Sequence, residues 1–296
     1  MWLFSLLPLR VLYLFSDIVY GLFVLCPPLR YRRRIVRRNL ESSFPDKSSA
    51  WLGDTERRFY RNFCDLFFAE MLKTCSLSAK SVARRMTFTG IGQLESTFSE
   101  GRSAILYLGH LYNWEWVTSI GLHFSPENVA AHVYHPLENR TVDEVFCHIR
   151  QRYGAVNVPM DRVLRRLLEF RSEGRPFVLG MIADQVPLMW SIGYWTDFLN
   201  HDTPVFTGSE KIARKLDTAV YYGEMTKVRR GHYNVNIRLI CDHPSELPEN
   251  EITERYFRML EQTVRTDPAL WLWSHNRWKR TRESYHKWLA GRGKRQ

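Results

Sequence analysis

The chain has 296 residues, with 42 Lys or Arg against 31 Asp or Glu, which gives a formal net charge of +11. This length allows one large α/β domain, which we favour, or two small ones, with room for a sizeable core. Ten Trp, fourteen Tyr and seventeen Phe in so basic a chain favour a protein held against an anionic membrane surface, with nucleic acid as the competing partner. Five scattered cysteines lack metal-ligand spacing, which excludes a cysteine-based metal site and predicts reduced thiols on the cytosolic side of a membrane.

Residues 1–29 are the most apolar part of the chain, and Arg10 and Asp17 interrupt them. A spanning helix needs about 20 predominantly apolar residues, so this segment qualifies only if the Asp17 carboxyl is sheltered or neutral. We therefore predict an N-terminal anchor that either spans the membrane or lies at its interface. A cleaved signal peptide is disfavoured because the positive charges follow the apolar stretch and no small-residue cleavage site closes it.

A run of arginines follows the apolar segment directly, at positions 30, 32, 33, 34, 37 and 38. By the positive-inside rule these residues hold the remainder of the chain in the cytoplasm, and they attract acidic head groups. A solvated basic helix is the alternative. The polar, turn-rich residues 42–49 then form a linker. We therefore divide the chain into an anchor over 1–29, a basic juxtamembrane segment and linker over 30–50, and a main domain over 51–296.

Helices and strands alternate beyond the linker. Asp54 is expected to cap a helix whose Phe59, Phe63, Phe67 and Met71 recur at spacing four, as core or as a surface for lipid. Further elements follow from apolar periodicity and from glycine or proline stops: strands over 104–108, 129–134, 155–158, 177–183, 219–223 and 233–240, and helices over 141–154, 161–174 and 251–266. This order predicts an α/β fold with a central, mostly parallel or mixed sheet flanked by helices, preceded by the membrane-anchoring helix.

The stretch from Ala104 to Trp116 organises the rest of the chain. Its apolar strand ends at Gly109, which permits a sharp turn, and His110 and Glu115 follow. In open α/β sheets the reactive crevice lies beyond the carboxyl ends of the strands, so His110 is expected at its lip. The two side chains can meet only if His110 precedes the helix that contains Glu115, because five residues along a helix turn them about 140° apart.

His110 and Glu115 can serve one chemistry. The imidazole can take a proton from a hydroxyl or amine that attacks an acyl carbonyl, and a carboxylate can fix its tautomer. Neither Ser nor Cys stands beside His110, so the nucleophile is expected to be the acceptor substrate itself. The alternative is a core histidine with a surface glutamate. His132 and His135 would point to opposite faces of a strand without a third ligand nearby, so we predict no metal site.

Six spaced blocks of residues carry a resemblance to a known family. The chain resembles the late, secondary acyltransferases of lipid A synthesis, within the lysophospholipid acyltransferase superfamily marked by His-x-x-x-x-Asp/Glu. The blocks span nearly the whole chain and are His110 to Glu115; Tyr134-His135-Pro136 with Asn139; Arg150-x-Arg152; Ala183-Asp184-Gln185; Phe198 with Thr203-Pro204-Val205, Gly208 and Ala213-Arg214; and Trp271 to Lys279.

The resemblance implies roles for particular residues. His110 would be the general base, Glu115 its orienting partner, and Arg150 a binder of the oxyanion or of an acceptor phosphate, with a surface arginine as the alternative. Substrate-binding positions would be Asn113, Asn139, Arg152, Asp184, Gln185, Trp273, His275, Arg277 and Lys279, although a structural C-terminal cluster is equally open for the last four. Two departures bear on the acceptor: His135 stands where the family has arginine before proline, and residues 186–190 replace its proline-glycine segment.

The implied function is a membrane-associated O-acyltransferase that moves a fatty acyl group from an acyl carrier protein to a hydroxyl of a lipid A precursor. It would need no cofactor and would work on the cytoplasmic face of the inner membrane. A lysophospholipid or aminolipid acceptor, and coenzyme A as donor, are alternatives, and a non-catalytic lipid-binding membrane protein is the non-enzyme alternative. Nucleic-acid binding is disfavoured because the arginines adjoin the anchor instead of an aromatic-lined groove.

Overall fold

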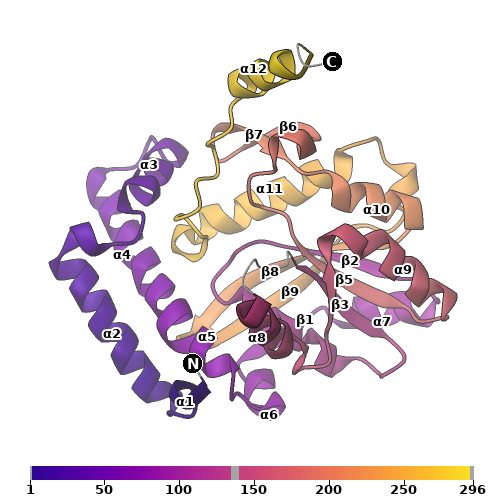
Figure 1. Cartoon of the computed structure of the whole chain (residues 1–296), viewed down its shortest axis with the longest axis horizontal. Helices are drawn as coiled ribbons and strands as arrows, with labels where there is room; N and C mark the ends of the chain where they lie inside the picture. The colour runs from indigo at the N-terminus through magenta and orange to yellow at the C-terminus, as the bar shows by residue number, and fades with distance from the viewer. Residues whose placement is uncertain (1, 135–139, 294–296) are drawn as a thin grey trace.

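The computed structural model describes residues 2–134 and 140–293. Within them a mixed sheet of seven strands runs in the order β1-β9-β8-β2-β5-β3-β4 (Figure 1). Only β8 and β9 are antiparallel, and every other neighbouring pair in this sheet is parallel. The strands are β1 (Met86–Thr89), β2 (Ala104–Leu108), β3 (Val129–Tyr134), β4 (Val156–Pro159), β5 (Phe177–Ile182), β8 (Ala219–Arg229) and β9 (His232–Cys241). The predicted α/β class with a mixed, mostly parallel sheet is confirmed.

The helices precede, connect and follow these strands. They are α1 (Trp2–Ser5), α2 (Leu9–Leu25), η1 (Pro27–Leu29), α3 (Arg33–Ser43), α4 (Ser49–Asp65), the π-helix η2 (Leu66–Glu70), α5 (Met71–Thr74), α6 (Ala79–Ala83), α7 (Gly92–Ser99), the 3-10 helix η3 (Trp114–His123), α8 (Arg140–Gln151), η4 (Met160–Arg162), α9 (Val163–Ser172), η5 (Met189–Ser191), α10 (Gly208–Leu216), η6 (Pro244–Glu246), α11 (Glu251–Thr266), η7 (Pro268–Leu270) and α12 (Arg282–Gly293). A small antiparallel pair, β6 (Tyr194–Phe198) and β7 (His201–Val205), lies outside the main sheet.

All six predicted strands are present, and β2 and β3 have the predicted bounds. Both helix stops assigned to glycine are confirmed, because Gly154 and Gly174 adopt φ of +82° and +66°, where a residue without Cβ is favoured. The strands β1, β6 and β7 were not predicted. Strands β6 and β7 contain Asp197, Asp202 and Pro204, residue types that are depleted in strands.

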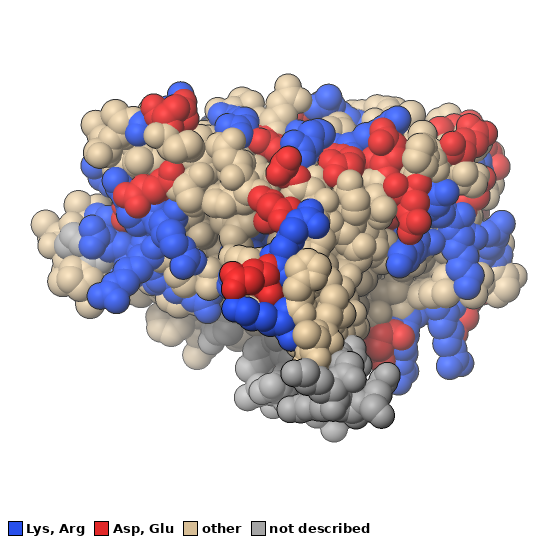
Figure 2. Space-filling model, turned by 90° about the horizontal axis from the view of Figure 1, so that it is seen from above, with Lys and Arg blue, Asp and Glu red and all other residues tan. Residues whose placement is uncertain are grey.

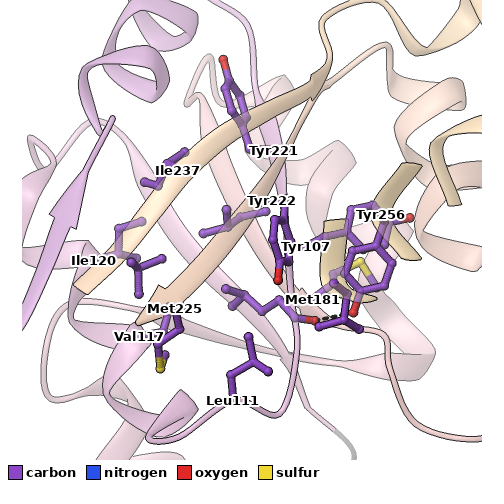
Figure 3. Packing of buried hydrophobic residues seen from close by; sticks show 14 of the residues in the cluster. Tyr107, Leu111, Val117, Ile120, Met181, Tyr221, Tyr222, Met225, Ile237 and Tyr256 are labelled. Atoms are coloured by element: carbon purple, nitrogen blue, oxygen red, sulfur yellow. Dashed lines mark hydrogen bonds between the residues drawn. The ribbon is translucent and has the colours of Figure 1, made fainter. Parts of the chain in front are cut away.

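Two helical layers cover the sheet. Adjacent residues of a strand point to opposite faces, and in β2 this separates Tyr107 from Leu106 and Leu108. Tyr107 stacks on Tyr256 of α11 with ring centroids 4.6 Å apart (Figure 3). Leu106 and Leu108 instead face a cavity that they share with Val117 of η3. Helices α11 and η3 therefore cover opposite faces of the central strand.

The N-terminal helices pack on one side of this core, where α2 lies along α4 (Figure 1). Helix α4 begins at Ser49, and Ser48 caps it by accepting a hydrogen bond from the backbone N–H of Trp51. Our expectation of an Asp54 cap was wrong because that residue already lies inside the helix. Phe59 is buried in the core as the spacing predicted, and Phe63 packs against it.

No helix within residues 2–134 and 140–293 combines the length and the apolar character needed to cross a membrane. Helix α2 has 17 residues, about 26 Å at 1.5 Å per residue, and lies between Pro8 and Pro27. Its Asp17 binds Arg230 and Arg61, and the hydrogen bond from Arg230 lowers the pKa of this carboxyl. The described residues 2–29 therefore do not form the spanning helix that was one of our two alternatives for this segment.

Candidate active site

The site forms where two central strands end side by side. Strands β2 and β5 are parallel neighbours, and their last residues, Leu108 and Ile182, are paired in register. His110 and Asp184 each follow two residues later, so the sheet itself brings them together at its carboxyl edge. Gly109 packs closely against α11, because a Cβ there would lie 2.7 Å from Leu260 Cδ1 and would force that side chain to shift.

Asp184 holds the His110 ring from behind. The ring Nδ1 lies 2.5 Å from Asp184 Oδ1, and the backbone N–H of His110 donates to Oδ2 at 2.8 Å. Trp271 Nε1 donates to the same Oδ2 at 2.7 Å. Although burial alone would raise it, the charge and hydrogen bonds of His110 lower the pKa of the Asp184 carboxyl to about 2. The carboxylate is thus ionised and oriented by three donors.

The other ring nitrogen of His110 faces outward. Because Nδ1–H donates to Asp184, the hydrogen-bond network assigns the lone pair to Nε2, which lies 3.0 Å from Gln185 Nε2. The Trp114 ring meets the imidazole edge to face with centroids 5.0 Å apart. The side chain of His110 is 16% exposed and lines a cavity between the sheet and η3. A proton acceptor is therefore presented to whatever enters that cavity.

Glu115 does not hold the imidazole in this structure. Its carboxylate accepts hydrogen bonds from Arg150 Nε at 2.9 Å and Nη2 at 2.7 Å, and from Trp114 Nε1 at 3.2 Å. Burial would raise the pKa of Glu115, but Arg150 outweighs it and the pKa is lowered. The orienting contact that we expected from Glu115 is made by Asp184, because the strand register delivers Asp184 to Nδ1 whereas the turn of η3 aims Glu115 at α8.

Removing one charge of the Glu115–Arg150 pair should destabilise the fold. The two side chains are 10% and 24% exposed, so Glu115→Gln leaves a mostly buried guanidinium without its counter-charge. We expect a loss of about 2–3 kcal/mol in the free energy of unfolding, measured by denaturant titration. The double variant with Arg150→Met should recover most of it. Arg165→Gln, in the exposed pair with Glu169, is the control and should cost at most about 0.5 kcal/mol. A Glu115→Gln variant as stable as that control would contradict the expectation.

The cavity beside His110 has a volume of about 560 Å³. It lies between the sheet and η3, and its walls are mainly apolar, including Leu106, Leu108, Val117, Ile120, Val178 and Met181. Small residues of β3 and β5, among them Ala130, Ala131 and Gly180, leave this space open. His132 also lines it, and burial lowers the pKa of its imidazole to about 4, so it is neutral. The cavity can accept a hydrocarbon chain with its reactive end at His110.

Three of the predicted substrate-binding residues are fully buried. Asn113 donates to Glu70, and Trp273 donates to the carbonyl of Pro268. Arg277 donates to the carbonyl of Pro204, and burial lowers the pKa of its guanidinium to about 10. All three are 0% exposed, so they support the site from within the protein.

The remaining predicted residues lie at different distances from the chemistry. Gln185 reaches His110, whereas Arg152 donates to the carbonyls of Thr74, Cys75 and Leu77 and ties the end of α8 to that segment. Burial lowers the pKa of His275 to about 4, and Lys279 is exposed. Asn139 and His135 lie outside the described residues.

Two features of the site escaped sequence reasoning. Asp184 was predicted at the crevice but as a substrate contact, not as the partner of His110. A signal was available, since both residues follow predicted buried strands at the same offset, but their pairing depends on β2 and β5 being neighbours. Glu70, which binds Asn113, gave no signal because it lies between Phe68 and Met71 in an aromatic stripe.

The fold and the site together define a class of enzyme. An α/β sheet that presents a carboxylate-oriented histidine to a mainly apolar cavity belongs to an enzyme equipped to activate a nucleophile beside a hydrocarbon chain. The sequence profile of the bacterial lipid A biosynthesis acyltransferases matches residues 1–280. The chain therefore belongs to the bacterial lipid A biosynthesis acyltransferase family and is an acyltransferase that acts on a lipid A precursor. No curated protein sequence matched the chain.

Proposed function

We propose that the enzyme transfers a fatty acyl group from an acyl carrier protein to a hydroxyl of the lipid A precursor, with His110 as the general base. The observation that carries this proposal is the His110 ring at the wall of the apolar cavity, held at Nδ1 by the buried Asp184, with the lone pair of Nε2 accepting from the Gln185 amide. Asp184 is a positioning residue that also stabilises the imidazolium formed when the base takes its proton.

The reaction then proceeds in two steps. The acceptor oxygen bonds to the thioester carbonyl carbon while His110 Nε2 takes the hydroxyl proton, and a tetrahedral oxyanion forms. Collapse of this intermediate breaks the carbon–sulfur bond, and the imidazolium returns its proton to the departing thiolate. Two N–H groups of Arg150 are bound to Glu115, so its other donors, or backbone N–H groups, stabilise the oxyanion. Gln185 supports the same role, since its amide already lies beside Nε2.

The donor and acceptor can be identified with purified enzyme. Acyl carrier protein and coenzyme A thioesters of one fatty acid are each supplied with a labelled lipid A precursor, a lysophospholipid or an aminolipid. Transfer from the carrier protein to the lipid A precursor is the expected result. Faster transfer from coenzyme A would overturn the proposed donor, and chain binding without thioester cleavage would favour a non-catalytic lipid-binding protein.

Docking of the acidic carrier protein should depend on ionic strength. A basic protein attracts an acidic partner through exposed charges, and salt screens this attraction. We expect kcat/KM for the carrier-protein thioester to fall about tenfold between roughly 0.05 M and 0.5 M NaCl. The matched control is the uncharged pantetheine thioester, whose kcat/KM should change less than about twofold. Equal salt dependence of the two donors would contradict electrostatic docking.

We further propose that the enzyme works at the cytoplasmic face of the inner membrane, with residues 1–29 as an interfacial anchor, 30–50 as a basic segment and 51–296 as the acyltransferase domain. The outer face of α2 exposes apolar side chains, notably Leu14, Phe15, Ile18 and Leu25. Lys and Arg gather at the left of the face in Figure 2, the side on which α3 lies. An apolar helix face beside a basic one suits an anionic lipid surface.

A further inference from the structure

We infer that the N-terminal helix α2 is part of the active-site scaffold: Tyr13, through the buried Glu70 and through Asn113, positions the turn that carries Trp114 and Glu115. This inference deepens the proposed function and rests on it, because it concerns the same site. It assigns to α2 an effect on turnover that is separate from any role in membrane attachment.

Glu70 is the centre of the network. Its side chain is 0% exposed and lies between three elements of the fold. Tyr13 of α2 donates to Oε1 at 2.7 Å, Asn113 donates to Oε2 at 2.7 Å, and Tyr233 of β9 donates to both oxygens at 2.8 and 2.9 Å. Burial raises the pKa of Glu70 while these hydrogen bonds oppose the rise. A buried carboxyl of this kind is costly unless its donors stay in place, so its position follows theirs.

A local irregularity of the helix accompanies this arrangement. Glu70 is the last residue of the π-helix η2, which separates the regular helices α4 and α5. A π-helical turn widens the backbone and changes the direction of the side chains that follow it, and such turns are frequent at functional sites. The π-helical turn therefore ends at Glu70, the residue that joins α2 to the turn that carries Trp114 and Glu115.

Asn113 connects Glu70 to the residues of the active site. Its Nδ2 binds Glu70, and its Oδ1 accepts a hydrogen bond from the backbone N–H of Trp116 at 3.2 Å, which caps η3. The two residues enclosed by this cap are Trp114, whose ring meets His110, and Glu115, which holds Arg150. A shift of the Asn113 amide therefore moves both groups that flank the base.

Hydrogen bonds and ion pairs fix helix α2 to the body of the enzyme, so it can hold Tyr13 in place. Ser16 donates to Asp65 at 2.8 Å, and Arg230 from the β8–β9 hairpin binds both Asp17 and Asp65 at 2.5 Å. The inner face of α2 thus contacts the body of the enzyme through Tyr13, Ser16 and Asp17, while its outer face stays exposed. Of these contacts, the one from Tyr13 leads to Glu70 and so to the active site.

The first test removes one hydroxyl. Tyr13→Phe should lower kcat by roughly 10- to 100-fold, because a misplacement of about 1 Å is enough for such losses, while KM for donor and acceptor stays within about twofold. Assays use the full chain in detergent, so membrane attachment does not limit the rate. Hydrogen–deuterium exchange should become faster at residues 110–118.

Two controls separate this effect from loss of the helix. Tyr20→Phe lies on α2 and keeps its aromatic ring beside Arg61, so kcat and exchange should not change. Ile18→Ser, on the exposed face of α2, should weaken binding to anionic phosphatidylglycerol vesicles and leave kcat in detergent unchanged. If Tyr13→Phe behaved like Tyr20→Phe, or if Ile18→Ser lowered kcat equally, the inference would be overturned.

The second test reverses the polarity of one hydrogen bond. Glu70→Gln alone can keep the contact, because its amide oxygen can accept from Asn113 while its NH2 faces the Tyr13 and Tyr233 hydroxyls, which can accept. Asn113→Asp alone instead places a carboxylate against Glu70. In the double variant, the amide introduced at position 70 can donate to the carboxylate introduced at position 113, which can still accept from Trp116 N–H. We expect Asn113→Asp alone to lose at least about tenfold in kcat and the double variant to recover most of it. Losses that multiply in the double variant would contradict the coupling.

The exchange measurement keeps the inference distinct from the proposed function. If His110→Ala kept full turnover while Tyr13→Phe still accelerated exchange at 110–118, the general-base proposal would fail and the coupling would stand. If His110→Ala were inactive while Tyr13→Phe changed neither exchange nor kcat, the coupling would fail and the proposed function would stand.

Discussion

Replacing His110 with Ala should lower kcat by about 10² to 10⁴, the range expected when a general base is removed. The acceptor hydroxyl would then lose its proton to water only, and the departing thiolate would lack its proton donor. Initial rates at saturating donor and acceptor measure the effect. The variant should stay folded, because the His110 side chain lies at the wall of a cavity and not inside the core.

His123→Ala is the matched control, since this exposed histidine of η3 lies outside the site. Added imidazole should partly restore turnover to His110→Ala, because the truncated side chain opens space toward the cavity. Near-normal turnover in His110→Ala would exclude His110 as the base. A loss of activity accompanied by a lower thermal midpoint than that of His123→Ala would assign a structural role instead.

Replacing Asp184 with Asn should lower kcat by about 10² to 10⁴ with little change in KM, as expected when the orienting carboxylate of a histidine base is lost. The amide NH2 would face Nδ1, which favours the tautomer with its proton on Nε2, the atom that must accept. The side-chain oxygen of Asn can still accept from Trp271, so the fold is largely retained. Initial-rate kinetics and thermal unfolding measure the two effects separately.

Asp161→Asn, at an exposed carboxylate of η4, is the control for loss of one negative charge. The comparison with Glu115→Gln decides which carboxylate orients the base. If Glu115→Gln abolished turnover and Asp184→Asn retained it, Glu115 would be the orienting residue during catalysis, despite its bond to Arg150. The observed hydrogen bonds predict the opposite result, with a larger loss of turnover in Asp184→Asn than in Glu115→Gln.

The location of the site could be predicted because its signals are local. An apolar run over 104–108 that stops at Gly109 specifies a buried strand, its end and a turn, and each of these depends on neighbouring residues only. The same holds for the helices that end at Gly154 and Gly174. His110 was therefore placed correctly at the carboxyl edge of the sheet.

The partners of the site could not be predicted because they are distant in the sequence. His110 and Asp184 are 74 residues apart, and Glu115 and Arg150 are 35 apart. Spacing along one helix says nothing about which strand lies beside β2 or which way η3 turns. The short interval between His110 and Glu115 therefore suggested a direct contact, whereas the fold joins each of them to another segment.

The hydrogen bond from Trp271 to Asp184 determines when, during synthesis of the chain, the active site can be completed. Trp271 also bridges to Leu111, so the residues after α11 complete the wall behind the base. Ribosomes deliver the N-terminal portions of a chain first. A growing polypeptide thus holds its histidine, its sheet and its hydrocarbon-binding space before it holds the indole that shields the carboxylate. We expect Asp184 to be fully oriented behind the base only after residue 271 has been synthesised and has packed against it.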